Sequence, residues 1–210
     1  METILLTSAG MNVKEEILKI LPKPANQIKL AHITTAKNPR LEKNPDYIIK
    51  EKKIMAEIGF QVEDIDIKEK KESDLKRILA DKDVIYVQGG NTFYLLKYVR
   101  ESGFDKVAKD LISKGMIYIG VSAGSYIACP TIEVAGWSHE DDNIVGLTNL
   151  KAMNLVPFLI KAHYSPEYKE VVIEGIKNSK YPVRILTDDQ AILVKNGKAK
   201  LVGKGKEIRL

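Results

Sequence analysis

Apolar residues follow two alternating patterns through the first two thirds of the chain. Short apolar or alternating runs predict strands over residues 4–7, 28–34, 61–67, 83–87 and 116–120. Between them, apolar residues at helical spacing predict helices over 13–21, 44–58, 73–79, 92–100 and 104–113. Ser73 is the expected N-cap of the helix over 73–79. Because such alternation is typical of a mostly parallel sheet with helices on both faces, we predict an α/β fold.

The last third of the chain has a different pattern. Residues 137–143 are polar without clear periodicity and predict a loop. Short strands are predicted over 184–187, 191–195 and 199–202, and Asn196-Gly197 between the last two is a strong hairpin-turn signal. The C-terminus should therefore form an antiparallel edge of the sheet. Because no repeat, low-complexity tract or linker interrupts the chain, residues 1–210 are predicted to form a single domain.

Charge and composition narrow the classes of function. Lysine and arginine number 33 against 28 acids, but the two signs are interspersed and aromatic residues make up only 7% of the chain. We therefore expect no nucleic-acid partner, because such binding needs a basic face, usually with stacking aromatics. The single cysteine forms no intrachain disulfide, and no run approaches the roughly 20 apolar residues that span a bilayer. Without a signal-peptide pattern at the N-terminus, a cytoplasmic protein with no membrane partner is expected.

A candidate nucleophile lies directly after the strand predicted at 116–120. Gly120-Val121-Ser122-Ala123-Gly124 matches G-x-S-x-G, and the residues that follow can start a helix. A nucleophile elbow requires this strand-to-helix context, because flanking glycines allow the sharp turn that exposes the serine hydroxyl. Ser122 is the predicted nucleophile, with an inert serine in a glycine-containing turn as the alternative.

A second glycine turn follows the strand at 83–87. Parallel strands end at the same edge of a sheet, so Gly89-Gly90 and the Ser122 turn should border one crevice. Gly90 and Ala123 are the predicted backbone donors of an oxyanion hole. The alternative is that the glycines only permit a turn and that Asn91 or Thr92 caps a helix.

Three histidines could serve as the general base for Ser122. His163 follows an apolar stretch downstream of the serine, in the order common to many α/β hydrolases, and is the predicted base. His32 lies inside a predicted strand and is expected to be a core residue. His139 lies in the acidic loop 138–142, which could hold a metal by composition, but no zinc-ligand spacing supports one. We predict no metal and no cofactor.

Cys129 is a competing nucleophile, seven residues after Ser122. A continuing helix would carry it about two turns away from the crevice. We expect a buried structural cysteine.

The motifs together resemble the peptidase E, or S51, family, which also includes the cyanophycinases. The residues that carry the resemblance are Val87-Gln88-Gly89-Gly90-Asn91-Thr92-Phe93, Gly120-Val121-Ser122-Ala123-Gly124, Ala128-Cys129-Pro130-Thr131-Ile132 and His163. The resemblance implies a flavodoxin-like or class I glutamine-amidotransferase-like α/β fold and no metal. It also implies a serine-histidine-acid hydrolase of aspartyl peptides, with Ser122 as nucleophile and His163 as base.

Two regions offer the acid that would orient the histidine. Asp141 and Asp142 lie between Ser122 and His163, where one family assignment has an aspartate. Asp188 falls where another assignment has a glutamate. We favour Asp188, because a carboxylate at a strand end is held more rigidly than one in a polar loop.

The chain departs from the aspartyl dipeptidases after the histidine. Those enzymes carry a longer segment with arginines for the substrate carboxylate, whereas no arginine occurs here between His163 and Arg184. Recognition of an N-terminal aspartate is therefore left open: either Lys161 or Lys169 binds that carboxylate as a point charge, or the substrate differs.

The sequence thus predicts a serine peptidase that hydrolyses a peptide or amide bond in aspartyl dipeptides or related short peptides. Its expected partner is a small peptide substrate, and a homodimer is left open. The alternative is a non-catalytic small-molecule-binding or regulatory protein on the same fold.

Overall fold

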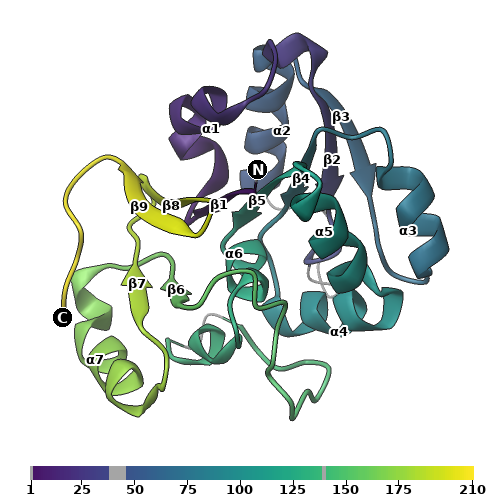
Figure 1. Ribbon diagram of the computed structural model, residues 1–210. Helices are drawn as coiled ribbons and strands as arrows, with labels where there is room; N and C mark the ends of the chain where they lie inside the picture. Colours follow the sequence, from purple (N-terminus) through teal and green to yellow (C-terminus); the bar gives the residue numbers. More distant parts are fainter. Residues whose placement is uncertain (1, 38–45, 139–140) are drawn as a thin grey trace.

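The computed structural model describes residues 2–37, 46–138 and 141–210 (Figure 1). Its strands are β1 (Thr3–Thr7), β2 (Lys29–Ile33), β3 (Gln61–Ile65), β4 (Val84–Val87), β5 (Ile117–Val121), β6 (Leu159–Lys161), β7 (Val183–Ile185), β8 (Gln190–Lys195) and β9 (Lys198–Gly203). Its α-helices are α1 (Lys14–Ile20), α2 (Asp46–Ile58), α3 (Glu72–Leu79), α4 (Thr92–Ser102), α5 (Phe104–Ser113), α6 (Ala123–Ala128) and α7 (Lys169–Asn178). None of these helices is long and apolar enough to cross a bilayer.

Seven strands form one sheet in the order β3-β2-β4-β5-β1-β8-β9. The first five run parallel, whereas β8 pairs with β1 and β9 pairs with β8 in the antiparallel sense. The predicted α/β fold with an antiparallel C-terminal edge is therefore confirmed. The hairpin between β8 and β9 turns at Asn196 and Gly197, whose φ angles of 47° and 75° are those of the expected two-residue turn.

Helices cover both faces of the sheet, as Figure 1 shows. Apolar side chains of α3, α4, α5 and α6 pack with one face of the strands, and those of α1 and α2 pack with the other. Central strands such as β1 and β5 are buried along their whole length because both faces are covered. The helices thus fix the carboxyl edge of the sheet, where β1, β4 and β5 all end.

Two sequence predictions are corrected by the structure. The strand expected at 184–187 is not part of the main sheet, because β7 pairs in parallel with β6 in a separate two-stranded sheet beside α7. Ser73 is not an N-cap, since α3 begins one residue earlier at Glu72. Lys71 occupies the N-cap position, and the Asp74 carboxylate accepts its backbone N–H at 3.0 Å.

Candidate active site

Ser122 occupies a strained turn between β5 and α6. Its φ of 47° and ψ of −106° lie in a region that non-glycine residues rarely adopt. The turn is held by Ser122 N–H, which donates to the Thr7 carbonyl at 3.1 Å, and by its own carbonyl, which accepts from Ser125 and Tyr126. The Ser125 hydroxyl contacts the Thr7 and Gly120 carbonyls at 2.8 Å, which ties α6 to β1 and β5. Strain that the surroundings maintain in this way is typical of functional sites.

Glycines on both sides of Ser122 permit close backbone contacts. A Cβ atom at Gly120 would lie 2.6 Å from the Gly124 carbonyl oxygen, and one at Gly124 would lie 2.2 Å from the Val87 carbonyl oxygen. No side chain fits at those distances. The helix after the turn therefore packs directly on β4 and β5. The two glycines of the G-x-S-x-G pattern make this close packing possible.

Gly124→Ala is expected to lower the free energy of unfolding by about 1–3 kcal/mol, because its Cβ overlaps the Val87 backbone. Chemical denaturation of both proteins measures the difference. Gly136→Ala is the matched control, since a Cβ there meets nothing within 4 Å. A Gly124→Ala protein as stable as the wild type would contradict the tight packing of this turn.

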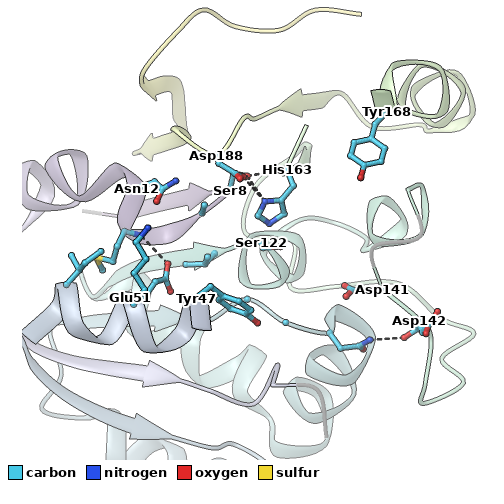
Figure 2. Close-up of a pocket in the computed structure, with 18 of the residues that line it drawn as sticks. Ser8, Asn12, Tyr47, Glu51, Ser122, Asp141, Asp142, His163, Tyr168 and Asp188 are labelled. Atoms are coloured by element: carbon cyan, nitrogen blue, oxygen red, sulfur yellow. Dashed lines mark hydrogen bonds and ion pairs between the residues drawn. The ribbon is translucent and has the colours of Figure 1, made fainter. Parts of the chain in front are cut away.

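His163 follows β6 and is also held in a left-handed backbone conformation, with φ of 53°. Its backbone N–H donates to the Ser8 hydroxyl at 2.8 Å, and its ring Nδ1 lies 2.6 Å from Asp188 Oδ1. Because a carboxylate accepts, Nδ1 carries the proton and Nε2 of the neutral ring is left as an acceptor. Figure 2 shows the ring above Ser122, on the same side of the pocket. Ser122 and His163 are not hydrogen bonded to each other among the residues described.

Asp188 receives two hydrogen bonds in this arrangement. Besides His163, the Ser8 hydroxyl donates to Asp188 Oδ1 at 2.8 Å. The hydrogen bond with His163 lowers the pKa of Asp188 below its usual range and the bond with Ser8 adds to this effect, while desolvation by the surrounding protein opposes it even though the side chain is 56% exposed. Asp188 therefore remains ionised at neutral pH, as an acid that orients an imidazole must.

Ser8 was missed by the sequence analysis. It directly follows β1, which pairs in parallel with β5, so it lies at the same sheet edge as Ser122. Its fully buried side chain contacts both His163 and Asp188. A serine at the end of a strand was the available signal, but only the strand order shows which strand lies beside the elbow.

Asp141 and Asp142 contact the start of α4 instead of His163. Asp141 Oδ2 accepts the Thr92 backbone N–H at 2.9 Å, and the Asp142 carbonyl accepts from the Asn91 side chain at 2.8 Å. A carboxylate at this helix terminus is favourably placed against the positive end of the helix dipole. Of the three acids considered, Asp188 is the one that contacts His163 in the structure.

The glycine turn after β4 borders Ser122, as the shared sheet edge predicts. A Cβ at Gly89 would lie 3.3 Å from Ser122 Cβ, and Gly90 adopts a φ of 145° against the Ala36 backbone. Asn91 is the N-cap of α4, with its side chain accepting Tyr94 N–H at 2.8 Å. Neither Gly90 nor Ala123 donates its N–H to a backbone carbonyl within the described residues.

A pocket of about 680 Å³ collects these groups (Figure 2). Its wall includes Ser8, Gly90, Ser122, His163 and Asp188, together with residues of α2. It is large enough for a short peptide.

The other sequence candidates lie away from this arrangement or outside the described residues. His32 is fully buried, with ring nitrogens 2.8 Å from Asp64 and 2.7 Å from Gln88, and is a core histidine as expected. Cys129 is buried, and burial raises the pKa of its thiol to about 12, which makes it a poor nucleophile. His139 lies outside the described residues.

Lys161 and Lys169 do not line the pocket. Lys161 is completely buried, donates to the Ala162 carbonyl at 2.8 Å and lies over the Tyr168 ring. The structure therefore does not place the Lys161 ammonium group where a substrate carboxylate in this pocket would contact it.

Comparison with known proteins decides the family. The model of peptidase family S51 matches residues 4–202. The chain belongs to peptidase family S51. This membership and the named relatives below support a serine-type peptidase.

The chain is similar to several proteins named as peptidases, over different shares of their length. Uncharacterized peptidase Lmo0363 of Listeria monocytogenes is 34% identical over 155 residues, which cover 71% of this chain and 74% of the relative. Peptidase E of Escherichia coli is 35% identical over 120 residues, which cover 57% of this chain and only 49% of that protein. The crystal structure of a candidate peptidase E protein from Listeria monocytogenes EGD-e has a TM-score of 0.84 at 28% identity, covering 98% of this chain and all of that chain.

Proposed function

We propose that this S51 peptidase hydrolyses short peptides through Ser122, His163 and Asp188. The observation that carries the proposal is the 2.6 Å contact between His163 Nδ1 and Asp188, in the pocket that also contains the strained Ser122 turn. A serine hydroxyl needs a base at neutral pH, and a histidine oriented by a carboxylate supplies one.

In the first half of the reaction, Ser122 Oγ attacks the peptide carbonyl carbon while His163 Nε2 takes the hydroxyl proton. The carbonyl π electrons move to oxygen, and the N–H groups of Gly90 and Ala123 stabilise that oxyanion. When the C–N bond breaks, His163 gives its proton to the leaving nitrogen, and an ester with Ser122 remains.

In the second half, water attacks the ester as His163 takes a proton from it. The C–O bond to Ser122 then breaks, and His163 returns the proton to Ser122 Oγ. Asp188 stays ionised throughout and stabilises the imidazolium that forms in each half.

The charged residues that line the pocket affect which substrate side chains it can bind. Glu51, Asp141, Asp142 and Asp188 line it, whereas Lys50 is the one lysine or arginine among the described lining residues. This balance is unfavourable for an aspartyl side chain, which needs a cationic partner when it is buried. We therefore propose short peptides as the substrate class, without a requirement for an N-terminal aspartate.

A fluorophosphonate probe tests the proposal, because it reacts with serines that a neighbouring base activates. The wild-type protein is expected to be labelled at Ser122, as located by peptide mass spectrometry, and Ser122→Ala is expected to remain unlabelled. Hydrolysis of a dipeptide library that includes aspartyl and isoaspartyl members should be measured in parallel. A folded wild-type protein that neither reacts with the probe nor cleaves any peptide would instead support the non-catalytic binding protein.

A further inference from the structure

Glu51 is a buried acid in the pocket wall to which the proposed reaction gives no role. It lies on α2 with a relative exposure of 8%, although its neighbours in the sequence are charged and solvent-facing. Its Oε1 atom accepts hydrogen bonds from Met11 N–H and from the Tyr86 hydroxyl, both at 3.1 Å. A buried charged group ordinarily has partners for all of its polar atoms.

The second oxygen of this carboxylate is unsatisfied. Oε2 is buried and has no hydrogen-bond partner in the part of the chain that the structure describes. No lysine, arginine or histidine among those residues forms an ion pair with Glu51. The carboxylate thus has one oxygen fixed by the protein and one that lacks a donor.

The surroundings of Glu51 are shaped to hold the carboxylate in this position. Gly10 makes room for it, because a Cβ there would lie 1.9 Å from Glu51 Oε1 and 2.2 Å from the Tyr86 hydroxyl oxygen. Burial, and next the charge of Glu51, raises the pKa of Tyr86 well above its usual value. Tyr86 therefore stays protonated and donates to Glu51, so the carboxylate is fixed by the fold.

Glu51 and Ser122 are anchored on the same residue at the end of β1. The Thr7 carbonyl accepts the Ser122 N–H at 3.1 Å, while its hydroxyl accepts the N–H of Gly10, which packs against the Glu51 carboxylate. Figure 2 shows the Glu51 side chain reaching from α2 toward Ser122. Glu51 and Ser122 therefore line the same pocket from positions that the end of β1 fixes together.

We propose that Glu51 binds the α-ammonium group of the peptide substrate through Oε2 and thereby selects peptides with an unblocked N-terminus. The inference rests on the proposed peptidase function. An ammonium group supplies the hydrogen-bond donor and the positive charge that this oxygen lacks. The α-nitrogen of a residue is roughly 2.5 Å from its own carbonyl carbon, since only Cα separates them. An ammonium bound to Glu51, in the pocket that Ser122 also lines, would therefore bring the first peptide bond to the nucleophile, and the reaction would remove the N-terminal residue.

We expect Tyr47 to be the side chain that moves to admit the ammonium group. It lies one turn before Glu51 on the same face of α2, lines the pocket and is 47% exposed. Because Oε2 itself is covered, a ligand reaches it when a neighbouring side chain turns. An exposed tyrosine changes rotamer quickly, so this motion does not require the backbone to move.

The experiment measures binding in the Ser122→Ala background, where no cleavage occurs. Titration calorimetry compares a panel of Xaa-Ala dipeptides with their des-amino analogues, in which hydrogen replaces the α-ammonium group. Unblocked dipeptides are expected to bind at least tenfold more tightly than the analogues. Adding Glu51→Gln should reduce this ratio to within twofold of one while leaving the affinity for the des-amino analogues unchanged.

Lys50→Gln is the matched control, because Lys50 is the neighbouring pocket residue on α2 and is exposed. It should leave the ratio at tenfold or more. Three results would overturn the inference. The first is an affinity ratio near one when Glu51 is intact, and the second is a ratio that stays at tenfold in Glu51→Gln. The third is the absence of binding by any unblocked dipeptide. Preferential binding of N-acetyl-lysyl-alanine over the unblocked panel would also overturn it, because the site would then hold a side-chain ammonium.

Fluorophosphonate labelling separates this inference from the proposed function. Glu51→Gln with Ser122 intact should still react with the probe, because Glu51 does not contact the nucleophile, the base or Asp188. Labelling together with a failed ammonium preference would reject only the role of Glu51. Absent labelling of the wild type would reject the peptidase mechanism, whatever the binding ratio.

Discussion

The His163→Asn variant is expected to lose roughly 10⁴- to 10⁶-fold in kcat, because removal of the general base leaves the Ser122 hydroxyl protonated. Asparagine is preferred to alanine because it tolerates the left-handed backbone at this position, where φ is 53°. The variant should therefore retain the fold while losing the base. Hydrolysis of the best peptide from the library and the rate of fluorophosphonate labelling both measure the loss.

Thermal unfolding of the same preparation is the control for this variant. A melting temperature within a few degrees of the wild type would assign the loss to chemistry. If the folded His163→Asn protein kept more than a hundredth of the wild-type rate, His163 would not be the base. The proposed mechanism would then fail even if Ser122 were labelled.

Much of the fold was predictable because its signals are local. Each strand of the main sheet, and each helix that covers it, is predicted from apolar residues at the right spacing within one short segment. The hairpin is predicted from Asn196-Gly197 alone. The small β6–β7 sheet was not predictable in the same way. Its two strands have only three residues each, and more than twenty residues separate them in the sequence. The sequence of either strand therefore does not indicate that the two pair. The sequence therefore predicted a strand near Arg184 but not its parallel pairing with β6 in a separate sheet.

In the candidate site, too, the local features could be predicted from the sequence and the contacts between distant residues could not. The Ser122 turn could be predicted, since its strand, glycines and helix are adjacent in the sequence. The contact of His163 with Asp188 spans 25 residues, and that with Ser8 spans 155, so the choice of acid stayed open. The burial of Glu51 could not be predicted from the sequence at all. It lies in the charged run Lys50-Glu51-Lys52-Lys53, a pattern typical of a solvated helix face.

Asp188→Asn is expected to lower kcat by roughly 10³- to 10⁴-fold with little change in the fold. An asparagine amide donates to His163 Nδ1 where the carboxylate accepted, so the ring proton moves to Nε2 and the acceptor for the Ser122 proton is lost. Ser8 hydrogen bonds to the same oxygen, so its hydroxyl must also reorient in the variant. Steady-state kinetics on the library peptide measures the effect.

Asp189→Asn is the matched control, since this neighbouring acid is exposed and does not line the pocket. It should change kcat by less than twofold. The double variant His163→Asn/Asp188→Asn should be no slower than His163→Asn alone, because an acid that acts only through the histidine has no effect once the histidine is gone. A single Asp188→Asn variant with more than a tenth of the wild-type kcat would exclude Asp188 as the orienting acid. Asp141, which also lines the pocket, would then be the next residue to replace.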